Sequence, residues 1–404
     1  GMSGRPFLQI PGPTNVPERV LRAMDRAVID HRSPEFAELT QAVRSGLRSV
    51  FGTRDGVPML YPASGTGATE AALVNLLAPG DRVLVFNYGV FSGGMATIAR
   101  EFGFEVDEVV LRYGQALPAD QVEAKLRADS PTDPYRAVLV VHNETSTGVT
   151  VDVQAVSQAL DAAGHDALLL VDTVSSLGCM PFCMDEWRVD VAICGSQKGL
   201  MLPPGLGVLC VGQRALALAQ NGGGSPRHFW DWAPIVRENR IGLFPYTPAT
   251  LMLFGLREAL AMLVDEEGLD AVYARHTRLA DGVRTAVRAW GLPMVCEDPA
   301  CASNSITAVR VPDGFDSNVL VTHARERYNL ALGGGIAQLN GVAFRIGHLG
   351  SLNELEVLGT IGGIELAFAD LELDVAPGSG LLACQRSFLM ADAGVTEAGL
   401  LAAS

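Results

Sequence analysis

Lysine is nearly missing from this sequence of 404 residues. Only Lys125 and Lys198 stand among its 30 basic residues, and the others are arginines. Chemistry that requires a side-chain amine therefore has two candidates. Positive charge as a whole is also in deficit, because 45 acidic residues leave a formal net charge of −15. This balance argues against nucleic acid or an anionic membrane surface as a partner.

Long apolar runs and metal-binding patterns are lacking too. No uninterrupted apolar stretch approaches the ~18 residues that cross a bilayer, and the first residues carry no signal-peptide core. The seven cysteines form no C-x-x-C, and neither they nor the seven histidines fall at metal-ligand spacing. We therefore expect a reduced, cytoplasmic protein without a metal ion.

What the sequence does contain is a regular alternation of apolar and amphipathic segments. Hydrophobic residues make up 48% and charged residues 19%, which excludes intrinsic disorder. The candidate strands are Arg82–Phe86, Ala137–His142, Ala167–Asp172, Val189–Cys194 and Gly207–Val211. Their nearly continuous apolar character suits a parallel sheet buried on both faces, and helical patterns lie between them. The alternation predicts an α/β fold with right-handed crossovers.

The pattern changes in the last third of the chain. A long helix, roughly Ala249–Glu266, ends near Gly268, and the order of helices and strands that follows predicts a smaller α+β domain. The tail after Pro377–Gly378 is rich in Ala, Gly and Ser, and we expect it to be loosely ordered. The predicted organisation is an N-terminal arm (residues 1–16), a large domain (17–267) and a small C-terminal domain (268–404).

Lys198 follows a candidate buried strand, in a segment, Cys194–Gly199, that carries no other charge. A lysine placed there is desolvated, which lowers its pKa and frees the amine as a nucleophile or Schiff-base former. Lys125 lies beside Glu123 and Arg127 on a polar helix, where a solvated role is natural. The alternative for Lys198 is a strand-end lysine that reaches solvent.

Asp172 ends the apolar run Ala167–Asp172. A carboxylate at the carboxyl end of a buried parallel strand points into the crevice where α/β sheets bind ligands. Such a carboxylate requires a cationic or hydrogen-bonding partner, and a protonated pyridine nitrogen would be one. The alternative is a helix N-cap, because Thr173 and Ser175 follow.

The segment Ser64–Thr69 opens a predicted helix with small residues. Exposed backbone N–H groups at a helix N-terminus form a phosphate site. A dinucleotide fingerprint is the rival, but Glu70 stands where its third glycine would be, and the next strand ends at Asn87 without an acidic ribose partner. A Gly-rich turn without a ligand is the third interpretation.

Arg345 lies between apolar residues on a short predicted strand of the second domain. Its planar guanidinium suits a substrate carboxylate, and a structural salt bridge is the alternative. A phosphate cradle, a strand-end acid, a desolvated lysine and a carboxylate-binding arginine together match what pyridoxal 5′-phosphate requires.

With these residues in place, the sequence resembles the class V, fold-type I, pyridoxal-phosphate aminotransferases, and most of all serine–glyoxylate and alanine–glyoxylate aminotransferases. The resemblance runs from Pro11 to about Ala369. Its motifs are Asp30–Pro34, Ser64–Ala68, His142–Gly148, Leu170–Asp172, Met184–Trp187, Gly195–Lys198, Pro245–Pro248 and Arg345–Gly350. The resemblance implies a large domain with a mostly parallel, seven-stranded sheet between helices, and a smaller C-terminal α+β domain.

The same resemblance implies roles for individual residues. Lys198 would hold the cofactor covalently, and Asp172 would pair with its pyridine nitrogen. The other cofactor contacts would be Gly67 and Ala68 at the phosphate through their backbone N–H groups, Gln197 beside them, Thr145 at the ring hydroxyl and Phe91 stacked on the ring.

A homodimer with active sites at its interface is implied as well. Thr247 would reach the phosphate of the neighbouring subunit, where Phe244 replaces a tyrosine of some relatives. Arg345 would bind the substrate α-carboxylate, and Arg32, next to His31, would belong to the substrate wall. Plant relatives end in a peroxisomal tripeptide, and the last three residues here do not match it.

We therefore expect ping-pong transamination in which L-serine, and also L-alanine, gives its amino group to glyoxylate, so that serine yields hydroxypyruvate and glycine. Another class V aminotransferase, with aspartate or ureidoglycine as donor, is the nearest alternative. A cysteine desulfurase-type lyase would require a nucleophilic cysteine on a mobile loop, for which Cys301 is the candidate, although no matching motif surrounds it. A non-enzymatic binding module would show no visible cofactor absorption.

Overall fold

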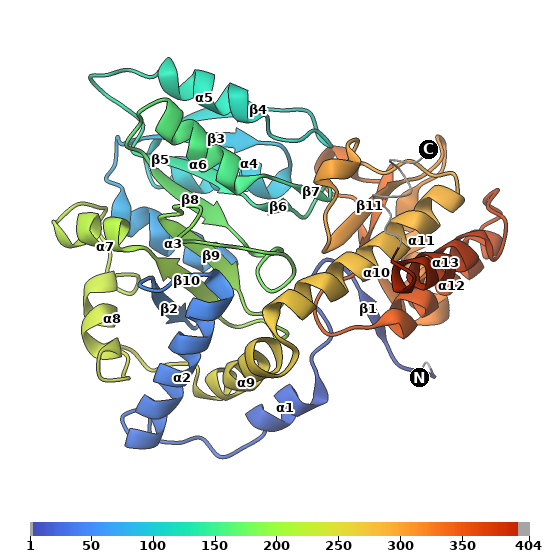
Figure 1. Ribbon diagram of the computed structural model, residues 1–404, viewed down its shortest axis with the longest axis horizontal. Coiled ribbons are helices and arrows are strands. Elements are labelled where there is room, and N and C mark those ends of the chain that lie inside the picture. The colour runs from blue at the N-terminus through green and yellow to red at the C-terminus, as the bar shows by residue number, and fades with distance from the viewer. Residues whose placement is uncertain (1–2, 395–404) are drawn as a thin grey trace.

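The computed structural model describes residues 3–394 and contains a large and a small lobe, each built on a β-sheet (Figure 1). The larger sheet has seven strands in the order β2-β10-β9-β8-β5-β3-β4. Their bounds are β2 Val57–Tyr61, β3 Arg82–Asn87, β4 Glu105–Val110, β5 Ala137–Val141, β8 Leu168–Asp172, β9 Val191–Gly195 and β10 Gly207–Val211. Neighbouring strands are parallel except at β10, which runs antiparallel to β2 and β9. The expected mostly parallel sheet is confirmed.

Helices cover this sheet, so its central strands carry apolar residues on both faces. Every residue of β5, β9 and β10 is buried. The helices of this lobe are α1 Glu18–Met24, α2 Pro34–Phe51, α3 Gly65–Leu76, α4 Val90–Glu101, α5 Ala119–Arg127, α6 Val153–Ala162, α7 Gln213–Gln220, α8 Trp232–Asn239 and α9 Thr250–Leu260. Helix α3 packs against β9 and β10, and α4 against β3 and β4. The two-residue strands β6 (Asn143–Glu144) and β7 (Val149–Thr150) form a separate hairpin.

The small lobe takes one strand from the beginning of the chain. Its sheet has the order β1-β12-β13-β11, with bounds β1 Phe7–Gln9, β11 Ile306–Arg310, β12 Leu330–Gly334 and β13 Ala343–Gly347. Strand β1 pairs in parallel with β12, whereas β13 is antiparallel to both β12 and β11. The helices of this lobe are α10 Leu269–Ala289, α11 Ser317–Tyr328, α12 Glu354–Asp370 and α13 Ser379–Asp392. Neither β1 nor β12 was predicted from the sequence. The first has only three residues and the second ends in two glycines, so neither shows a clear hydrophobic pattern of a strand.

Two helical segments differ from the sequence prediction. The long helix expected to reach Glu266 is α9 followed by π-helical turns over Ala261–Glu267, and it ends at Gly268, whose φ of 84° suits glycine. The expectation of a loosely ordered tail is wrong for residues 379–392, which form α13. Cys384 and Phe388, one helical turn apart, are buried in the core of the small lobe and anchor this helix there. Residues 395–404 lie outside the described part.

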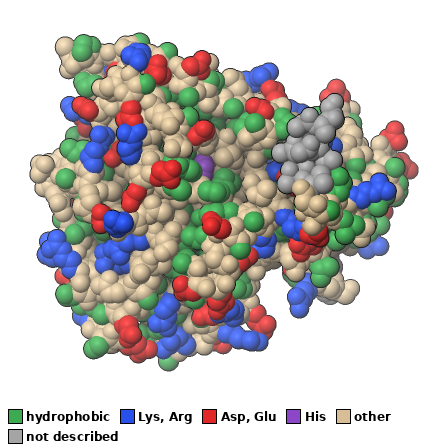
Figure 2. Space-filling view, viewed as in Figure 1, with side chains coloured by type: hydrophobic (Ala, Val, Ile, Leu, Met, Phe, Trp, Pro, Cys, Tyr) green, Lys and Arg blue, Asp and Glu red, His purple; other side chains and the backbone are tan. Residues whose placement is uncertain are grey.

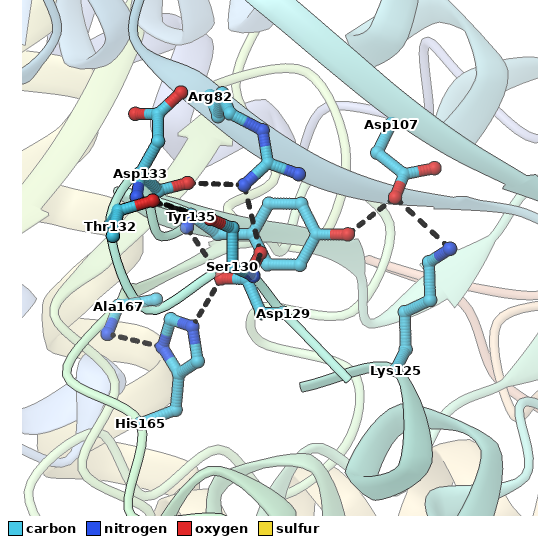
Figure 3. Close-up of polar contacts among 10 residues, drawn as sticks. All are labelled: Arg82, Asp107, Lys125, Asp129, Ser130, Thr132, Asp133, Tyr135, His165 and Ala167. Carbon is cyan, nitrogen blue, oxygen red and sulfur yellow. Dashed lines mark hydrogen bonds and ion pairs between the residues drawn. The ribbon is translucent and has the colours of Figure 1, made fainter. Parts of the chain in front are cut away.

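A network of polar contacts joins α5, β3, β4 and the segment just before β8, near the amino-terminal edge of the large sheet (Figure 3). The Asp129 carboxylate accepts hydrogen bonds from Arg82 (2.8 Å), from His165 Nε2 (2.7 Å) and from the Tyr135 N–H (2.7 Å). Lys125 on α5 forms an ion pair with Asp107 of β4 at 3.1 Å. One of the two lysines is therefore held at the edge opposite the carboxyl ends of the parallel strands.

Basic and acidic side chains are interspersed on the face of the molecule seen in Figure 2. Between residues 3 and 394 no helix is long and apolar enough to cross a bilayer. No group of three or more His, Cys, Asp or Glu side chains in the same range is placed to hold a metal ion.

Candidate active site

The carboxyl ends of the parallel strands meet at one edge of the large sheet and surround a cavity of about 530 Å³. Open α/β sheets bind ligands at this edge. Strand β8 ends at Asp172, β9 leads into Gln197 and Lys198, Thr145 lies beyond β5, and Phe91 stands at the start of α4 beyond β3. All five line the cavity. The structure thus brings together residues predicted from separate segments of the sequence.

Lys198 is buried, with 7% of its surface exposed. Loss of hydration lowers the pKa of its amine to about 8, and the negative charge of Asp172 opposes this shift. The amine is therefore far more often neutral near pH 8 than an exposed lysine would be, as the sequence predicted. Its Nζ lies 5.9 Å from the centre of the Phe91 ring.

The N-terminal segment fixes the backbone around Lys198. Thr14 donates its N–H to the Gln197 carbonyl at 3.0 Å, and its hydroxyl contacts the Gln197 and Lys198 carbonyls at 3.2 Å each. Gly12 packs directly on the Lys198 side chain. A Cβ at position 12 would lie 2.6 Å from Lys198 Cε, so a larger residue would not fit there. Sequence reasoning assigned no role to Gly12 or Thr14, since nothing local shows that a segment so early in the chain reaches residue 198.

Asp172 lies at the end of β8 and is partly exposed because it lines the cavity. Its Oδ1 accepts the N–H of Val174 at 2.8 Å, whereas no residue within 3–394 donates a hydrogen bond to Oδ2. No α-helix begins after it, so the N-cap alternative does not apply. Desolvation raises the pKa of this carboxyl to about 6. A cation in the cavity would reverse that shift, so the site is suited to a protonated ring nitrogen.

Helix α3 points its N-terminus toward the cavity. Ser64 is the N-cap, and Ser64, Gly65 and Thr66 line the cavity. The predicted phosphate ligands Gly67 and Ala68 come next in the helix and donate their N–H groups to the Ser64 hydroxyl (3.2 Å) and carbonyl (2.9 Å), respectively. A phosphate that binds the Gly67 N–H would take the place of the Ser64 hydroxyl.

Arg345 reaches the same region from β13 of the small lobe and is 9% exposed. It donates from Nε to the Gly334 carbonyl at 2.9 Å and from Nη1 to the Thr145 carbonyl at 3.2 Å. Burial lowers the pKa of the guanidinium to about 10, against the opposing charge of Glu144. Within residues 3–394 no carboxylate forms an ion pair with Arg345, so the structural salt bridge is not observed. A buried cation without an anion favours binding of an anionic ligand.

Glu144 was missed by sequence reasoning, although it lies inside the motif His142–Gly148. Its Oε1 accepts hydrogen bonds from the N–H groups of Phe91 (3.1 Å) and Ser92 (2.8 Å), at the start of α4. Its Oε2 accepts from the Ser146 N–H (3.0 Å) and hydroxyl (2.6 Å). This buried carboxylate therefore ties the turn that carries Thr145 to the helix that carries Phe91. The signal that could have found it is a carboxylate in an otherwise uncharged buried stretch.

Five predicted site residues do not line this cavity. Gly67, Ala68 and Arg345 form hydrogen bonds to Ser64 or Thr145, which do line it. Arg32 and Thr247 are exposed, and neither lines it. The backbone N–H of Arg32 donates to Asp30 Oδ1 at 2.9 Å. Phe91, which does line the cavity, is 41% exposed.

The comparisons with known proteins agree with this geometry. A family model described as "Aminotransferase class-V" matches residues 7–342. The chain belongs to the class V aminotransferases. A curated relative in this family, serine–glyoxylate aminotransferase of Methylorubrum extorquens, is 49% identical over 94% of this chain and 95% of its own length.

Further members of the family differ in the amino donor that their names give. The L-aspartate–glyoxylate aminotransferase of Paracoccus denitrificans is 44% identical over 94% of this chain and 95% of its own length. Among solved structures, ureidoglycine–glyoxylate aminotransferase of Bacillus subtilis superimposes with a TM-score of 0.88 at 26% identity, covering 96% of this chain and 98% of that one. The predicted fold-type I architecture is confirmed.

Proposed function

We propose that this aminotransferase moves the amino group of L-serine, and also of L-alanine, to glyoxylate, and that it uses pyridoxal 5′-phosphate. The observation that carries this proposal is the meeting of Lys198 and Asp172 in one cavity. An amine with a lowered pKa and a desolvated carboxylate that forms no ion pair within residues 3–394 are the two groups that this cofactor requires of its protein. Relatives named serine–glyoxylate aminotransferase, at 44–49% identity, support serine as the donor.

The residues present fit this cofactor. Lys198 would attach to it, Asp172 would hold its ring nitrogen protonated, and Thr145 would contact the ring hydroxyl. At the phosphate we place Gln197 and the N-terminus of α3. The Gly67 N–H would become free to donate once the Ser64 hydroxyl turns away, and the Ala68 N–H would have to share its hydrogen bond with the Ser64 carbonyl. Phe91 would stack on the ring. When bound, the cofactor supplies an electron sink that stabilises negative charge on the substrate Cα.

Proton movement is the task of Lys198. Because its pKa lies near 8, the free amine can take a proton from the substrate Cα and return it to the cofactor. Arg345 would hold the α-carboxylate of the amino acid and then that of glyoxylate, and its contact with the Thr145 carbonyl places it beside the ring site. Arg32 would complete the substrate wall.

We infer a homodimer in which each subunit completes the other's site. The exposure of Arg32, Thr247 and Phe91 supports this arrangement, because these residues would be covered by a partner. Thr247 would then reach the phosphate of the neighbouring subunit. We also propose the division into an arm (1–16), a large domain (17–267) and a small domain (268–404); β1 attaches the arm to the small sheet.

The second candidate is a class V aminotransferase with aspartate or ureidoglycine as donor, which the relatives of that specificity favour. A cysteine desulfurase-type reaction has less support, because Cys301 does not line the cavity. The test is an absorption spectrum of the holoenzyme with each donor. L-Serine should abolish the visible band of the lysine-bound cofactor, and glyoxylate should restore it. If only aspartate or ureidoglycine abolishes the band, that compound and not serine is the amino donor. If no donor abolishes it, the proposal fails.

A further inference from the structure

Two cysteines outside the active site lie against each other. Cys296 and Cys301 belong to the segment that joins the end of α10 to β11, and Cys301 ends the short 3₁₀ helix Pro299–Cys301. Their Sγ atoms are 3.5 Å apart, and each Sγ also lies 3.3 Å from the Asp298 carbonyl. Neither cysteine lines the large cavity.

We propose that Cys296 and Cys301 form a reversible disulfide, a site of oxidative modification in the small lobe. A disulfide S–S bond measures about 2.05 Å, so the two sulfur atoms need to approach by only about 1.5 Å. Both cysteines are partly exposed, whereas Cys179, Cys194, Cys210 and Cys384 are buried. An oxidant in solution therefore reaches this pair and not the cysteines of the core.

The surroundings shift the pKa values of the two thiols in opposite directions. The hydrogen bond from the Cys301 thiol lowers the pKa of Cys296, and the guanidinium of Arg284 acts in the same direction. The same hydrogen bond raises the pKa of Cys301, which keeps its proton. Cys296 is thus the thiolate that reacts first, and Cys301 is the thiol that resolves the product.

With a peroxide as oxidant the reaction balances in two steps. The Cys296 thiolate attacks one oxygen of hydrogen peroxide, the O–O bond breaks, hydroxide leaves, and a sulfenic acid forms on Cys296. The Cys301 sulfur then attacks the Cys296 sulfur; the S–O bond breaks and the oxygen leaves as water with the Cys301 proton. The two thiols supply the two electrons that reduce the peroxide, and a small dithiol reverses the reaction by exchange.

The segment after Cys301 lies against the hairpin that carries active-site residues. Ala302 forms a bridge with Val149, and the Ser303 N–H donates to the Gly148 carbonyl at 2.9 Å. Cys296 and Gly148 also line one small cavity of about 10 Å³. The cross-link would therefore form beside the β6–β7 turn without occupying the substrate site.

Peptide mass spectrometry of the wild-type holoenzyme tests the proposal. After treatment with hydrogen peroxide, free thiols are blocked with iodoacetamide and the protein is cut with trypsin. The tryptic peptide over residues 289–310 contains Cys296 and Cys301 and no other cysteine. We expect this peptide to lose the mass of two hydrogen atoms and both alkylation sites, and to regain them after dithiothreitol.

Cys183 is the internal control, because it is partly exposed but forms no hydrogen bond with another thiol in residues 3–394. It should stay alkylated at peroxide levels that convert the pair. In Cys301→Ser, Cys296 should instead trap a sulfenic-acid probe such as dimedone. The proposal is overturned if both cysteines remain alkylated after oxidation, if each is oxidised separately to a sulfinic acid, or if the disulfide joins two chains on a non-reducing gel.

Discussion

The Oε1 atom of Glu144 accepts the backbone N–H of Phe91 at 3.1 Å. Through this bond a buried carboxylate fixes the first turn of α4, and with it the Phe91 ring, whose centre lies 5.9 Å from the Lys198 Nζ. The same carboxylate holds the Ser146 N–H and hydroxyl, next to Thr145. Two walls of the cavity therefore depend on one side chain that does not line it.

Glu144→Gln should weaken cofactor binding. An amide has one acceptor oxygen, so the N–H groups of α4 or the Ser146 pair lose their partner, at a cost of about 1–3 kcal/mol. We expect the affinity of the cofactor-free protein for pyridoxal phosphate to fall about tenfold, a change of roughly 1.4 kcal/mol, measured by fluorescence titration.

Glu365→Gln is the matched control for this change. Glu365 is also buried and accepts the N–H groups of Gly378 (2.6 Å) and Leu381 (2.8 Å) at the start of α13, and none of these residues lines the cavity. It should lower the melting temperature while cofactor affinity stays at the wild-type value. If both variants lost the same affinity for the cofactor, Glu144 would contribute only to the stability of the fold and not specifically to cofactor binding.

The two lysines of the chain allow a direct comparison. Lys198→Ala removes the amine that moves the proton, and we expect turnover to fall by about a thousandfold or more. Lys125→Ala removes only an ion pair with Asp107 at the far edge of the sheet, and turnover should stay within twofold or so of the wild type, because such pairs contribute little. Steady-state rates with serine and glyoxylate measure the turnover of both variants. Near-normal turnover in Lys198→Ala would contradict the proposed chemistry.

The pH dependence of cofactor attachment reports the ionisation of Lys198. Burial lowers the pKa of this amine to about 8, so the fraction of nucleophilic, neutral amine rises as the pH passes through that value. In Lys125→Ala stripped of cofactor, the initial rate of attachment should increase from pH 7 to 9 with a midpoint near 8. Stopped-flow absorbance measures it; a midpoint near the ordinary lysine value of about 10.4 would contradict the lowered pKa.

Arg345→Met should separate substrate binding from folding. Loss of the guanidinium removes the charge-assisted pair with the substrate carboxylate, so the KM for serine and for glyoxylate should rise about tenfold to a hundredfold. The melting temperature should stay close to that of the wild type. Removing a buried cation that has no carboxylate partner within residues 3–394 is favourable, but the Gly334 and Thr145 carbonyls lose their donor. Unchanged KM values for both substrates would assign the carboxylate to another residue.

The local parts of the fold and of the site were predictable from the sequence. Runs such as Ala137–Val141 are apolar throughout, and a parallel sheet gathers the residues that follow its strands at one edge, so Asp172 and Lys198 were found together. A single-sequence pattern does not report contacts between distant segments. This is why Thr14, Glu144 and the pairing of β1 with β12 came only from the structure.

The segment that runs from β1 to Thr14 has a consequence for biosynthesis. The ribosome makes this segment before the large lobe, but its partner strand β12 emerges only after the whole large lobe has been translated. Domains generally acquire structure as units in the order of their synthesis. A nascent chain that has completed the large sheet thus still has β1 unpaired, and the segment that carries Thr14 is attached only through its bonds to Gln197 and Lys198. Premature termination before residue 330 would release a polypeptide that contains Lys198 but lacks β12, the strand with which β1 pairs.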